Sequence, residues 1–240
     1  MSVTFTIDIS NAKSTNMNGM NNIVKEVKFS LSGTDDVNTV TNFFPVKLDY
    51  PEAENFVEYE FDATAVMFSS GNVTERGRMG LIDSDGEVIV DAFCGIGYYT
   101  LQFLVRGGAS HVHACEINPD SISALEKGLM RNNVAEKCTI HQGDNRVTMR
   151  DLKGVADRVI LGLIPSSMNA WGLAIACLKP SGGTIHVHMN VHEDEVEEWV
   201  EKTTEWFATV SGKNVTALHL EDVKQYCPRI RHVVLDIRID

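Results

Sequence analysis

The sequence predicts an α/β fold: a doubly wound parallel sheet with a C-terminal antiparallel hairpin, preceded by a small β-rich N-terminal region. Three observations predict it. From residue 88 onward, short apolar runs that suit buried strands alternate with amphipathic helical segments. The final stretch, residues 215–239, holds two strand-like runs with no helix between them. Before about residue 80, apolar and polar residues alternate one by one, as in half-buried strands.

The N-terminal region contains three strand candidates. Val3, Phe5 and Ile7 alternate with polar residues, residues 27–31 alternate likewise, and FVEYEFDA at residues 56–63 is the third. Segments rich in Asn, Ser, Thr and Asp separate them and predict irregular loops. We therefore expect a small, partly irregular β-rich region at residues 1–80 and a second domain at residues 81–240.

The second domain is predicted to alternate between strands and helices. Parallel strands are expected at residues 87–93, 111–117, 138–144, 157–163 and 182–190, and helices at residues 99–106, 118–133, 171–178 and 192–212. Asn118 is the expected N-cap of the second helix, because its side chain can accept from the free N–H groups of the first turn. Gly107 and Gly108 are expected to end the first helix, since glycine adopts the left-handed conformation of a C-terminal cap.

Composition limits the classes of function. A chain of 240 residues with 43% hydrophobic residues can bury a core without disulfides. Its five cysteines include no C-x-x-C pair, which indicates reduced thiols in a cytoplasmic protein. Apolar runs fall short of the ~18 residues of a membrane span, so we expect no membrane partner. A net charge of −12 disfavours independent phosphate binding, so a nucleic-acid partner would need a local basic patch or additional domains.

A glycine-rich turn follows the first parallel strand in the segment VDAFCGIGYYT. Asp91 ends the strand, and Gly95 and Gly97 let the backbone approach a ligand where the chain turns into a helix. A dinucleotide fingerprint would need a third glycine where Thr100 stands, although Glu116 lies about 20 residues on, as a ribose-binding acid does. The turn therefore favours a nucleotide-type ligand over a nicotinamide dinucleotide. Glycines that serve only a tight turn are the alternative.

Acidic side chains recur at the ends of the first three expected parallel strands. Asp91 follows the first strand, Glu116 the second, and Asp144 with Asn145 the third. In a doubly wound sheet these ends meet in one crevice. A carboxylate at the second position can accept both hydroxyls of a ribose, and an Asp–Asn pair can bind the edge of an adenine. The pattern predicts an adenosine ligand without a pyrophosphate.

The motifs DAFCGIG, HACEINP, HQGDN and LIPSS, in this order, resemble those of Rossmann-like class I methyltransferases that use S-adenosylmethionine. More closely, residues 56–240 resemble the tRNA wybutosine-synthesising aminocarboxypropyltransferase family, a sister of the tRNA guanine-37 N1-methyltransferases. MFSSGNVTERGRM, HVHMNV and VKQYCPRIRHVVLDI add to the resemblance. It implies that residues 81–240 form the catalytic domain, with S-adenosylmethionine as co-substrate and tRNA-Phe as partner.

The resemblance also implies which residues hold S-adenosylmethionine. Ser69 and Arg76 lie in MFSSGNVTER, which resembles a loop that contacts the cofactor ahead of the sheet. Arg76 would bind the methionine carboxylate through two charge-assisted hydrogen bonds, and Ser69 would donate another. Without the resemblance, Arg76 beside Glu75 would be expected on the surface. The full expected cofactor set is Ser69, Arg76, Asp91, Gly95, Gly97, Glu116, Asp144 and Asn145.

The end of the fourth expected strand, DRVILGLIPSS, is apolar where catalysis is expected. Methyltransferases that act on amino groups often place Asn or Asp with Pro here, whereas this chain has Leu163, Ile164 and Pro165. The resemblance implies transfer of a 3-amino-3-carboxypropyl group to a carbon of a tricyclic wybutosine precursor, 4-demethylwyosine, at position 37, releasing methylthioadenosine. We expect these three residues to form an apolar shelf that stacks the flat base, with Ser166 or Ser167 at its polar edge.

Two other functions stay open. One is a tRNA guanine-37 N1-methyltransferase, which the absence of the Asn disfavours. The other is a non-catalytic subunit that binds S-adenosylmethionine without turnover. The sequence assigns no general base. His186 and His188 put two imidazoles on one strand face, but no Cys or acid completes a ligand set, so we expect no metal site.

Overall fold

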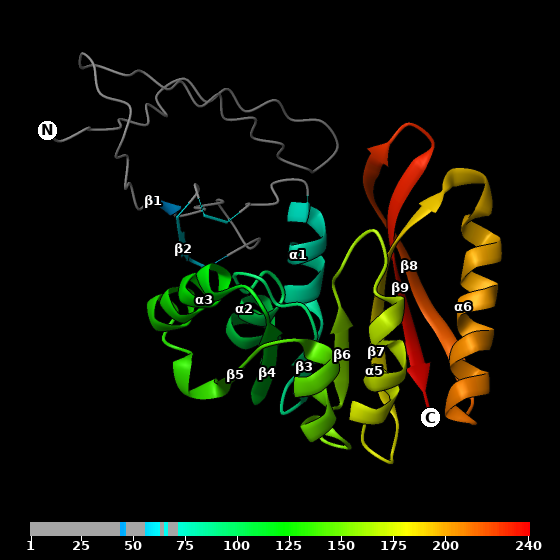
Figure 1. The fold of residues 1–240 in the computed structure, drawn as a ribbon, viewed down its shortest axis with the longest axis horizontal. Coiled ribbons are helices and arrows are strands. Elements are labelled where there is room, and N and C mark those ends of the chain that lie inside the picture. The colour runs from blue at the N-terminus through cyan, green and yellow to red at the C-terminus, as the bar shows by residue number, and fades with distance from the viewer. Residues whose placement is uncertain (1–43, 47–55, 63–64, 67–71) are drawn as a thin grey trace, which may run out of the picture. The chain divides into compact units, whose positions relative to one another are not determined.

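The structure is a computed structural model that describes residues 44–46, 56–62, 65–66 and 72–240 (Figure 1). For residues 44–46 it describes the backbone. The strand candidates at residues 3–9 and 27–31 and the site candidate Ser69 lie outside the described residues. The described elements belong to one compact unit, Phe43–Asp240.

A sheet of seven strands runs through this unit in the order β5-β4-β3-β6-β7-β9-β8. The strands are β3 (Val88–Asp91), β4 (His111–Glu116), β5 (Cys138–Gln142), β6 (Arg158–Leu161), β7 (Gly183–His192), β8 (Val215–Cys227) and β9 (Ile230–Ile239). The first five are parallel, whereas β9 is antiparallel to both β7 and β8. The predicted doubly wound sheet with a C-terminal antiparallel hairpin is confirmed. The chain adds β4 and β5 on one side of β3 and then β6 and β7 on the other side. In such sheets, ligands bind in a crevice at the carboxyl ends of the strands, where the order changes direction.

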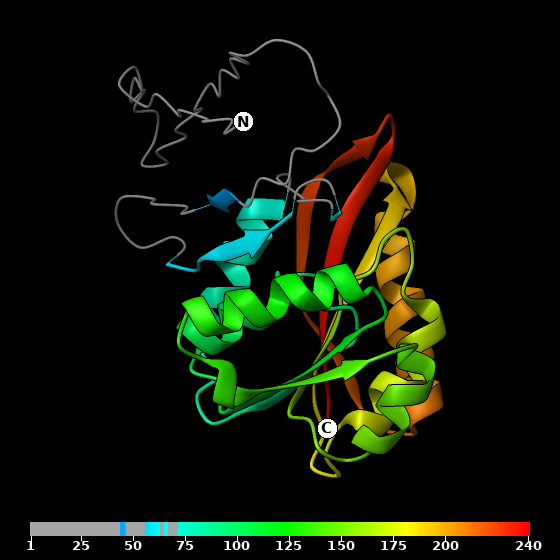
Figure 2. The ribbon, with the colours of Figure 1, turned by 60° about the vertical axis from the view of Figure 1, so that its left-hand side comes forward.

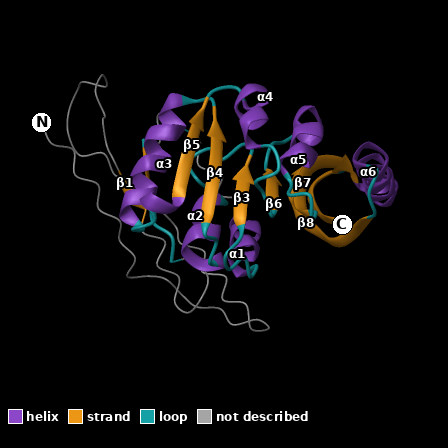
Figure 3. Cartoon of the chain, turned by 90° about the horizontal axis from the view of Figure 1, so that it is seen from below, coloured by secondary structure: helices purple, strands orange, loops and turns teal. Residues whose placement is uncertain are grey.

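Helices cover both faces of the sheet. They are α1 (Val73–Leu81), α2 (Thr100–Gln102) with a π-helical continuation (Phe103–Gly107), α3 (Pro119–Arg131), α4 (Asn145–Thr148), α5 (Trp171–Cys177) and α6 (Val196–Ser211). Short 3₁₀ turns occupy Ala135–Lys137, Met149–Leu152, Met168–Ala170 and Glu193–Glu195. Figure 3 shows α1 and α2 on one side of the parallel strands and α4 and α5 on the other.

Alternation along each strand divides the core in two. Ile89 of β3 packs into the cluster that contains Phe103 and Leu125, on the side of α2 and α3. Its neighbour Val90 packs into the other cluster, with Trp171 and Phe207 from α5 and α6. Successive side chains of a strand point to opposite faces, so apolar runs such as VIV and VIL are buried on both sides.

The expected helix ends are present. Asn118 caps α3, where its Oδ1 accepts from the backbone N–H of Asp120 at 3.0 Å. Gly108 ends the first helical segment in the left-handed conformation with φ of 80°. These local signals were sufficient because the cap residues act on the backbone of their own helix end.

Helix α1 was not predicted. The sequence VTERGRMGL contains two glycines, which disfavour a helix, and MFSSGNVTER was expected to be a loop. In the structure Arg76 lies on α1, and both Glu75 and Arg76 are fully buried. Without the family resemblance, Arg76 would have been expected on the surface, and that expectation is wrong because tertiary contacts bury this side of the helix.

A short antiparallel pair precedes α1. β2 (Tyr59–Phe61), which confirms the strand expected in FVEYEFDA, pairs with β1 (Phe44–Val46). Tyr59 and Phe61 join the cluster around Ile89, and β2 lies beside α3 (Figure 2). By its internal contacts, the chain divides into two units, Met1–Asn42 and Phe43–Asp240. The boundary near residue 80 is retained as a prediction from composition.

A chain of buried and half-buried charged and polar side chains, here called the sheet-crossing network, joins α1 to the sheet. Its members, in order of contact, are Glu75, Arg78, Asp236, His186, Arg158 and Glu87. Arg78 donates to Asp236 at 2.6 Å, and His186 Nδ1 lies 2.6 Å from the same carboxylate. Arg158 donates to His186 Nε2 at 2.8 Å, so that nitrogen is unprotonated and His186 is neutral. Burial also lowers the pKa of His186, which favours the neutral ring.

None of the helices in the described part of the chain combines the length and the apolar character that crossing a bilayer requires.

Candidate functional site

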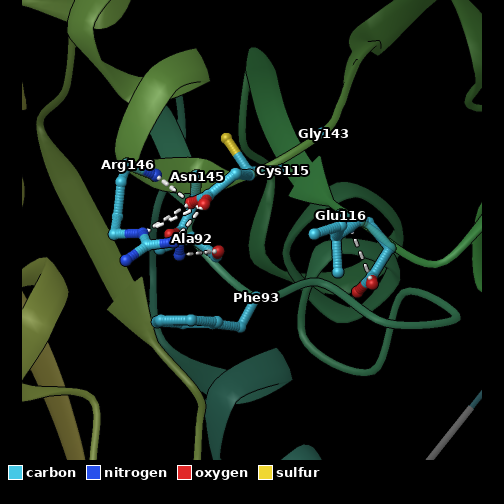
Figure 4. Close-up of a pocket in the computed structure, with 9 residues that line it drawn as sticks. Ala92, Phe93, Cys115, Glu116, Gly143, Asn145 and Arg146 are labelled. Atoms are coloured by element: carbon cyan, nitrogen blue, oxygen red, sulfur yellow. Dashed lines mark hydrogen bonds and ion pairs between the residues drawn. The ribbon is translucent and has the colours of Figure 1, made fainter.

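A cavity of about 250 Å³ opens at the carboxyl ends of β3, β4 and β5 (Figure 4). It is lined by Ala92, Phe93, Cys115, Glu116, Ile117, Gly143, Asp144, Asn145 and Arg146. In Figure 4, Glu116 lies on one side and Asn145 with Arg146 on the other. Whole small-molecule pockets enclose roughly 300 to 1,000 Å³, so this cavity suits one part of a ligand, such as a nucleoside. The structure brings together Glu116 and Asp144, the acids that the sequence placed at the ends of the second and third parallel strands.

Glu116 ends β4 with its carboxylate fixed by backbone donors. Its Oε2 accepts from the N–H of Gly95 at 2.8 Å, and its Oε1 accepts from the N–H groups of Ile117 and Asn118 at 2.9 and 2.8 Å. Two carboxylate oxygens offer about four acceptor positions, and these donors use three, so one remains for a ligand hydroxyl. Glu116 therefore ties the glycine-rich turn to β4 and can accept from a hydroxyl group at the cavity.

The glycine-rich turn depends on glycine at two positions. Gly95 and Gly97 have φ of 54° and 92°, which strain any residue with a side chain. A Cβ on Gly97 would lie 2.6 Å from Leu125 of α3. Gly97 therefore serves close packing of the turn on α3, whereas Gly95 brings its N–H to Glu116.

Asp91 is fully buried beneath the turn and does not line the cavity. Its carboxylate accepts from the Thr100 hydroxyl at 2.8 Å and from the Phe93 N–H at 3.3 Å. Burial raises the pKa of Asp91 to about 6, against the effect of these two donors. The arrangement fits a residue that holds the turn in shape for the ligand.

The third strand end supplies Asp144 and Asn145. Asp144 caps α4 by accepting from the Arg146 N–H at 2.9 Å, and the Arg146 guanidinium pairs with the same carboxylate at 2.5 Å. The hydrogen bonds from Arg146 lower the pKa of Asp144 to about 2. Asn145 donates from Nδ2 to the Ala92 carbonyl at 2.9 Å, which joins this loop to the one after β3. Asp144 is thus a carboxylate at neutral pH, able to accept from an amine.

Arg76 lies against the glycine-rich turn. The central carbon of its guanidinium is 5.5 Å from the centroid of the Tyr98 ring, which follows Gly97 in the turn. A guanidinium in such a position is attracted by the face of the ring. The buried charge is therefore held beside the turn that leads to the cavity, the place where a ligand carboxylate was expected.

The segment after β6 presents an apolar surface. Leu163 is 41% exposed, Pro165 is exposed and Ile164 is half-buried. The loop is held in place by backbone contacts, including the N–H of Asn190 on β7, which donates to the Pro165 carbonyl at 2.9 Å. We call residues 163–165 the shelf.

The two serines beside the shelf have local partners. Ser166 accepts from the Met168 N–H at 3.3 Å, and Ser167 accepts from Trp171 at 3.1 Å and is buried. Ser167 therefore anchors α5, and Ser166 is the more accessible of the two.

Sequence reasoning did not identify Phe93, Ile117 and Arg146 as lining residues. Their positions in the sequence could have indicated them. Phe93 lies just before the glycine-rich turn, Ile117 follows Glu116, and Arg146 follows Asn145. The described residues contain no group of three or more His, Cys, Asp or Glu arranged to hold a metal ion.

Comparison with known proteins identifies relatives. Residues 52–216 match the model of the TRM5/TYW2 methyltransferase domain. A Danio rerio protein named tRNA wybutosine-synthesizing protein 2 homolog is 43% identical over 220 residues, covering 77% of this chain and 53% of the relative. The Arabidopsis thaliana tRNA wybutosine-synthesizing protein 2/3/4 is 51% identical over 190 residues, covering 77% and 19%. The chain thus spans about half, or less, of the length of these curated relatives.

Solved structures show the same likeness. TYW2 of M. jannaschii, solved in complex with AdoMet, is 30% identical with a TM-score of 0.72, covering 80% of this chain and 89% of that one. The M. jannaschii tRNA m1G37 methyltransferase is 27% identical with a TM-score of 0.64, covering 78% and 55%. The match spans most of the sheet and the cavity, and the chain belongs to the TRM5/TYW2 methyltransferase domain family.

Proposed function

We propose that this chain transfers the 3-amino-3-carboxypropyl group of S-adenosylmethionine to 4-demethylwyosine at position 37 of tRNA-Phe, releasing methylthioadenosine. The single observation that carries the proposal over methyl transfer is the apolar shelf after β6, at the strand end where the guanine-37 N1-methyltransferases were expected to carry an Asn. The names of the relatives at 43% and 51% identity and the TYW2 structure with AdoMet support the same reaction and the same co-substrate.

The cavity supports a specific placement of S-adenosylmethionine. Glu116 would accept from a ribose hydroxyl, and Asp144 with Asn145 would bind the adenine edge, with the Asp carboxylate accepting from the exocyclic amine. Arg76, beside the turn that carries Gly95 and Gly97, would bind the methionine carboxylate. Asp91 would act by holding the turn, and the proposed role of Ser69 as a further donor rests on the family resemblance.

The sulfonium of S-adenosylmethionine carries several carbons that a nucleophile could attack, so the enzyme must select one of them. The methyl carbon is the least hindered, so the enzyme must hold the acceptor carbon in line with the S–Cγ bond, at about 3 to 3.5 Å from Cγ. A flat shelf can stack an extended base without drawing it toward a polar group. We therefore assign Leu163, Ile164 and Pro165 to orientation and exclusion of water, with Ser166 at the polar edge of the base.

A doubly labelled cofactor tests the proposal. S-adenosylmethionine carrying one label in the methyl group and another in the carboxyl carbon is mixed with the chain and with tRNA-Phe bearing the tricyclic precursor. Carboxyl label in the tRNA, with methyl label in released methylthioadenosine, is the expected result. Methyl label in the tRNA would replace the proposal with methyl transfer, and tight cofactor binding without label in the tRNA would indicate a non-catalytic subunit.

Leu163→Asn is expected to slow single-turnover transfer by about tenfold, because covering an apolar Leu side chain is worth roughly 1.5 to 3 kcal/mol when complete and a polar amide loses this contribution. Because Leu163 is exposed, its substitution leaves the hydrophobic core intact. Leu218→Asn, the same change at an exposed site on β8, is the control and is expected to leave the rate unchanged. An unaltered rate in Leu163→Asn would remove the support for the shelf.

The partner is proposed to be tRNA-Phe; the names of the relatives mention tRNA, and the choice of tRNA-Phe rests on the family resemblance. With a net charge of −12, binding of tRNA would depend on a local basic patch or on regions beyond the matched domain. We also propose a cytoplasmic location, from the cysteine spacing, and a division of roles between residues 1–80 and the cofactor-binding domain at residues 81–240.

A further inference from the structure

Two consecutive tyrosines follow the glycine-rich turn, and each ring lies against a glycine of a different segment. A Cβ on Gly95 would lie 3.4 Å from the Tyr98 ring. A Cβ on Gly162 would lie 3.1 Å from the Tyr99 ring. Gly95 belongs to the turn beside the cavity, whereas Gly162 immediately precedes Leu163 of the shelf. The dipeptide Tyr98–Tyr99, here called the tyrosine bridge, therefore contacts both the cofactor turn and the segment that carries the shelf.

Tyr98 forms the cofactor end of the tyrosine bridge. Its half-buried ring contacts Gly95 and also attracts the guanidinium of Arg76, whose central carbon is 5.5 Å from the ring centroid. The backbone of Tyr98 is held as well, because the hydroxyl of the buried Tyr59 donates to its carbonyl at 3.2 Å. Arg76 is the group proposed to bind the methionine carboxylate. Tyr98 therefore sets where that end of the cofactor is held.

Tyr99 forms the shelf end of the tyrosine bridge. The residue is 4% exposed, and its ring packs on His188 of β7 with centroids 5.1 Å apart. The φ of Gly162 is not positive, so the backbone conformation does not require glycine there. The glycine instead leaves room for the Tyr99 ring, as glycines do where another group approaches a strand closely. A side chain at Gly162 would push either the ring or the shelf outward.

We propose that the tyrosine bridge positions the transferred arm of S-adenosylmethionine against the acceptor base. This arm runs from the sulfonium through Cγ to the methionine carboxylate, so holding the carboxylate fixes the direction in which Cγ points. Tyr98 sets that anchor through Arg76, and Tyr99 sets the position of the shelf through Gly162. Two adjacent residues thus place both reactants, whose reacting atoms must come within about 3 to 3.5 Å of each other.

The same placement decides which bond of the sulfonium breaks. When Cγ is attacked, the new C–C bond forms as the S–Cγ bond breaks, and its electron pair stays on sulfur in methylthioadenosine. The acceptor carbon then releases its proton to water, and the C–H electrons return to the ring. Attack on the methyl carbon would leave S-adenosylhomocysteine instead. Tyr98 and Tyr99 are positioning residues in this step, and the inference rests on the proposed function for the identity of the transferred group.

Gly162→Ala tests the shelf end. The added methyl group should lower single-turnover transfer at saturating S-adenosylmethionine by about tenfold, since small displacements of reacting atoms are costly. The affinity for S-adenosylmethionine, measured by calorimetry, should stay within about twofold of wild type, because Tyr98 and Arg76 are unchanged. With the doubly labelled cofactor, the share of methyl label in the tRNA should rise, because the base no longer faces Cγ. A purely structural role for Gly162 would not move that share.

A second substitution shows whether the Tyr99 ring is what the added methyl group meets. Tyr99→Leu removes the edge of the ring. The double variant Gly162→Ala/Tyr99→Leu should therefore be about fivefold or more faster than the product of the two single losses predicts, a coupling usual for residues in contact. Gly172→Ala on α5 is the matched control, because a Cβ there meets no atom within 4 Å. It should transfer at the wild-type rate.

Tyr98→Leu tests the cofactor end without turnover. Losing the ring beside Arg76 should weaken S-adenosylmethionine binding by about fivefold, the usual size of an attraction between a guanidinium and a ring. Methylthioadenosine lacks the methionine carboxylate, so its affinity should stay within about twofold of wild type. Tyr98→Phe retains an aromatic face and should restore the binding of S-adenosylmethionine.

Three results would overturn the proposal. They are transfer by Gly162→Ala within about twofold of wild type, the absence of coupling with Tyr99→Leu, and equal losses of affinity for both ligands in Tyr98→Leu. Should Gly162→Ala fail to fold, the ligand comparison in Tyr98→Leu decides. The proposed function fails separately, through methyl label in the tRNA of the wild-type chain. The coupling and the two affinities can still be read in that case, because they compare variants with wild type.

Discussion

Glu116→Ala is expected to weaken S-adenosylmethionine binding by about 100-fold, because a hydrogen bond to a charged group is worth up to roughly 3 kcal/mol. The carboxylate ends β4 at the cavity and already binds the N–H groups of Gly95 and Ile117. Removing it would also loosen the glycine-rich turn. Glu116→Gln keeps one oxygen acceptor and should lose about tenfold. Isothermal titration calorimetry measures both variants.

Two comparisons make this prediction specific. Methylthioadenosine has the ribose but not the methionine carboxylate, so the loss of affinity caused by Glu116→Ala should be the same for it as for S-adenosylmethionine. Glu126→Gln changes the charge of the chain equally at an exposed position of α3 and should leave both affinities unchanged. An unchanged affinity in Glu116→Ala would show that the ribose is held elsewhere.

Asp236→Ala is expected to lower the free energy of unfolding by about 3 to 5 kcal/mol, the usual cost of removing one partner from a buried ion pair. Asp236 is the centre of the sheet-crossing network, bonded to Arg78 and His186 at 2.6 Å each. The variant leaves Arg78 with Glu75 as its remaining partner in the network and leaves the His186 N–H unpaired. Urea unfolding followed by circular dichroism measures the loss.

The exposed pair between Arg238 and Asp240 supplies the control. Asp240→Ala should change stability by less than about 0.5 kcal/mol, since exposed ion pairs contribute little. A loss of the same size in both variants, or no loss in Asp236→Ala, would contradict the importance of the network.

The same residue predicts a pH dependence. Burial alone would raise the pKa of Asp236, but His186 and Arg78 outweigh it and hold the pKa well below its usual range. A carboxyl whose pKa is depressed by folding adds stability above its unfolded pKa of about 4, and this is lost as the pH falls further toward the folded pKa. The wild-type chain should therefore lose stability below about pH 4 more steeply than Asp236→Asn.

Local sequence signals were sufficient for most elements of the sheet. Runs such as VIV in β3 and VIL in β6 are apolar on both faces, and both are buried between helices. Caps such as Asn118 and Gly108 act on their own helix ends, so they could be predicted without knowledge of the fold. The order of motifs placed Glu116, Asp144 and Asn145 at the ends of adjacent strands, and the structure places all three around one cavity.

Contacts between distant segments decided what local signals did not. Helix α1 has two glycines and little intrinsic preference for a helix. Its Arg78 nevertheless pairs with Asp236, which is 158 residues further along the sequence. The burial of Arg76 follows from this placement. Asp91 was expected among the cofactor residues with Glu116, but the register of the turn puts its carboxylate on Thr100, away from the cavity lining.

The sequence by itself determined the fold class, the strand order of the motifs and the acids at the strand ends, because alternation, caps and turns depend on neighbouring residues. Only the tertiary structure decided which polar groups meet across the sheet. His188 and His232 are 44 residues apart and carry no common motif, and strand pairing between β7 and β9 brings them to 3.1 Å. Long-range pairing depends on the packing of the whole sheet, which no short segment encodes.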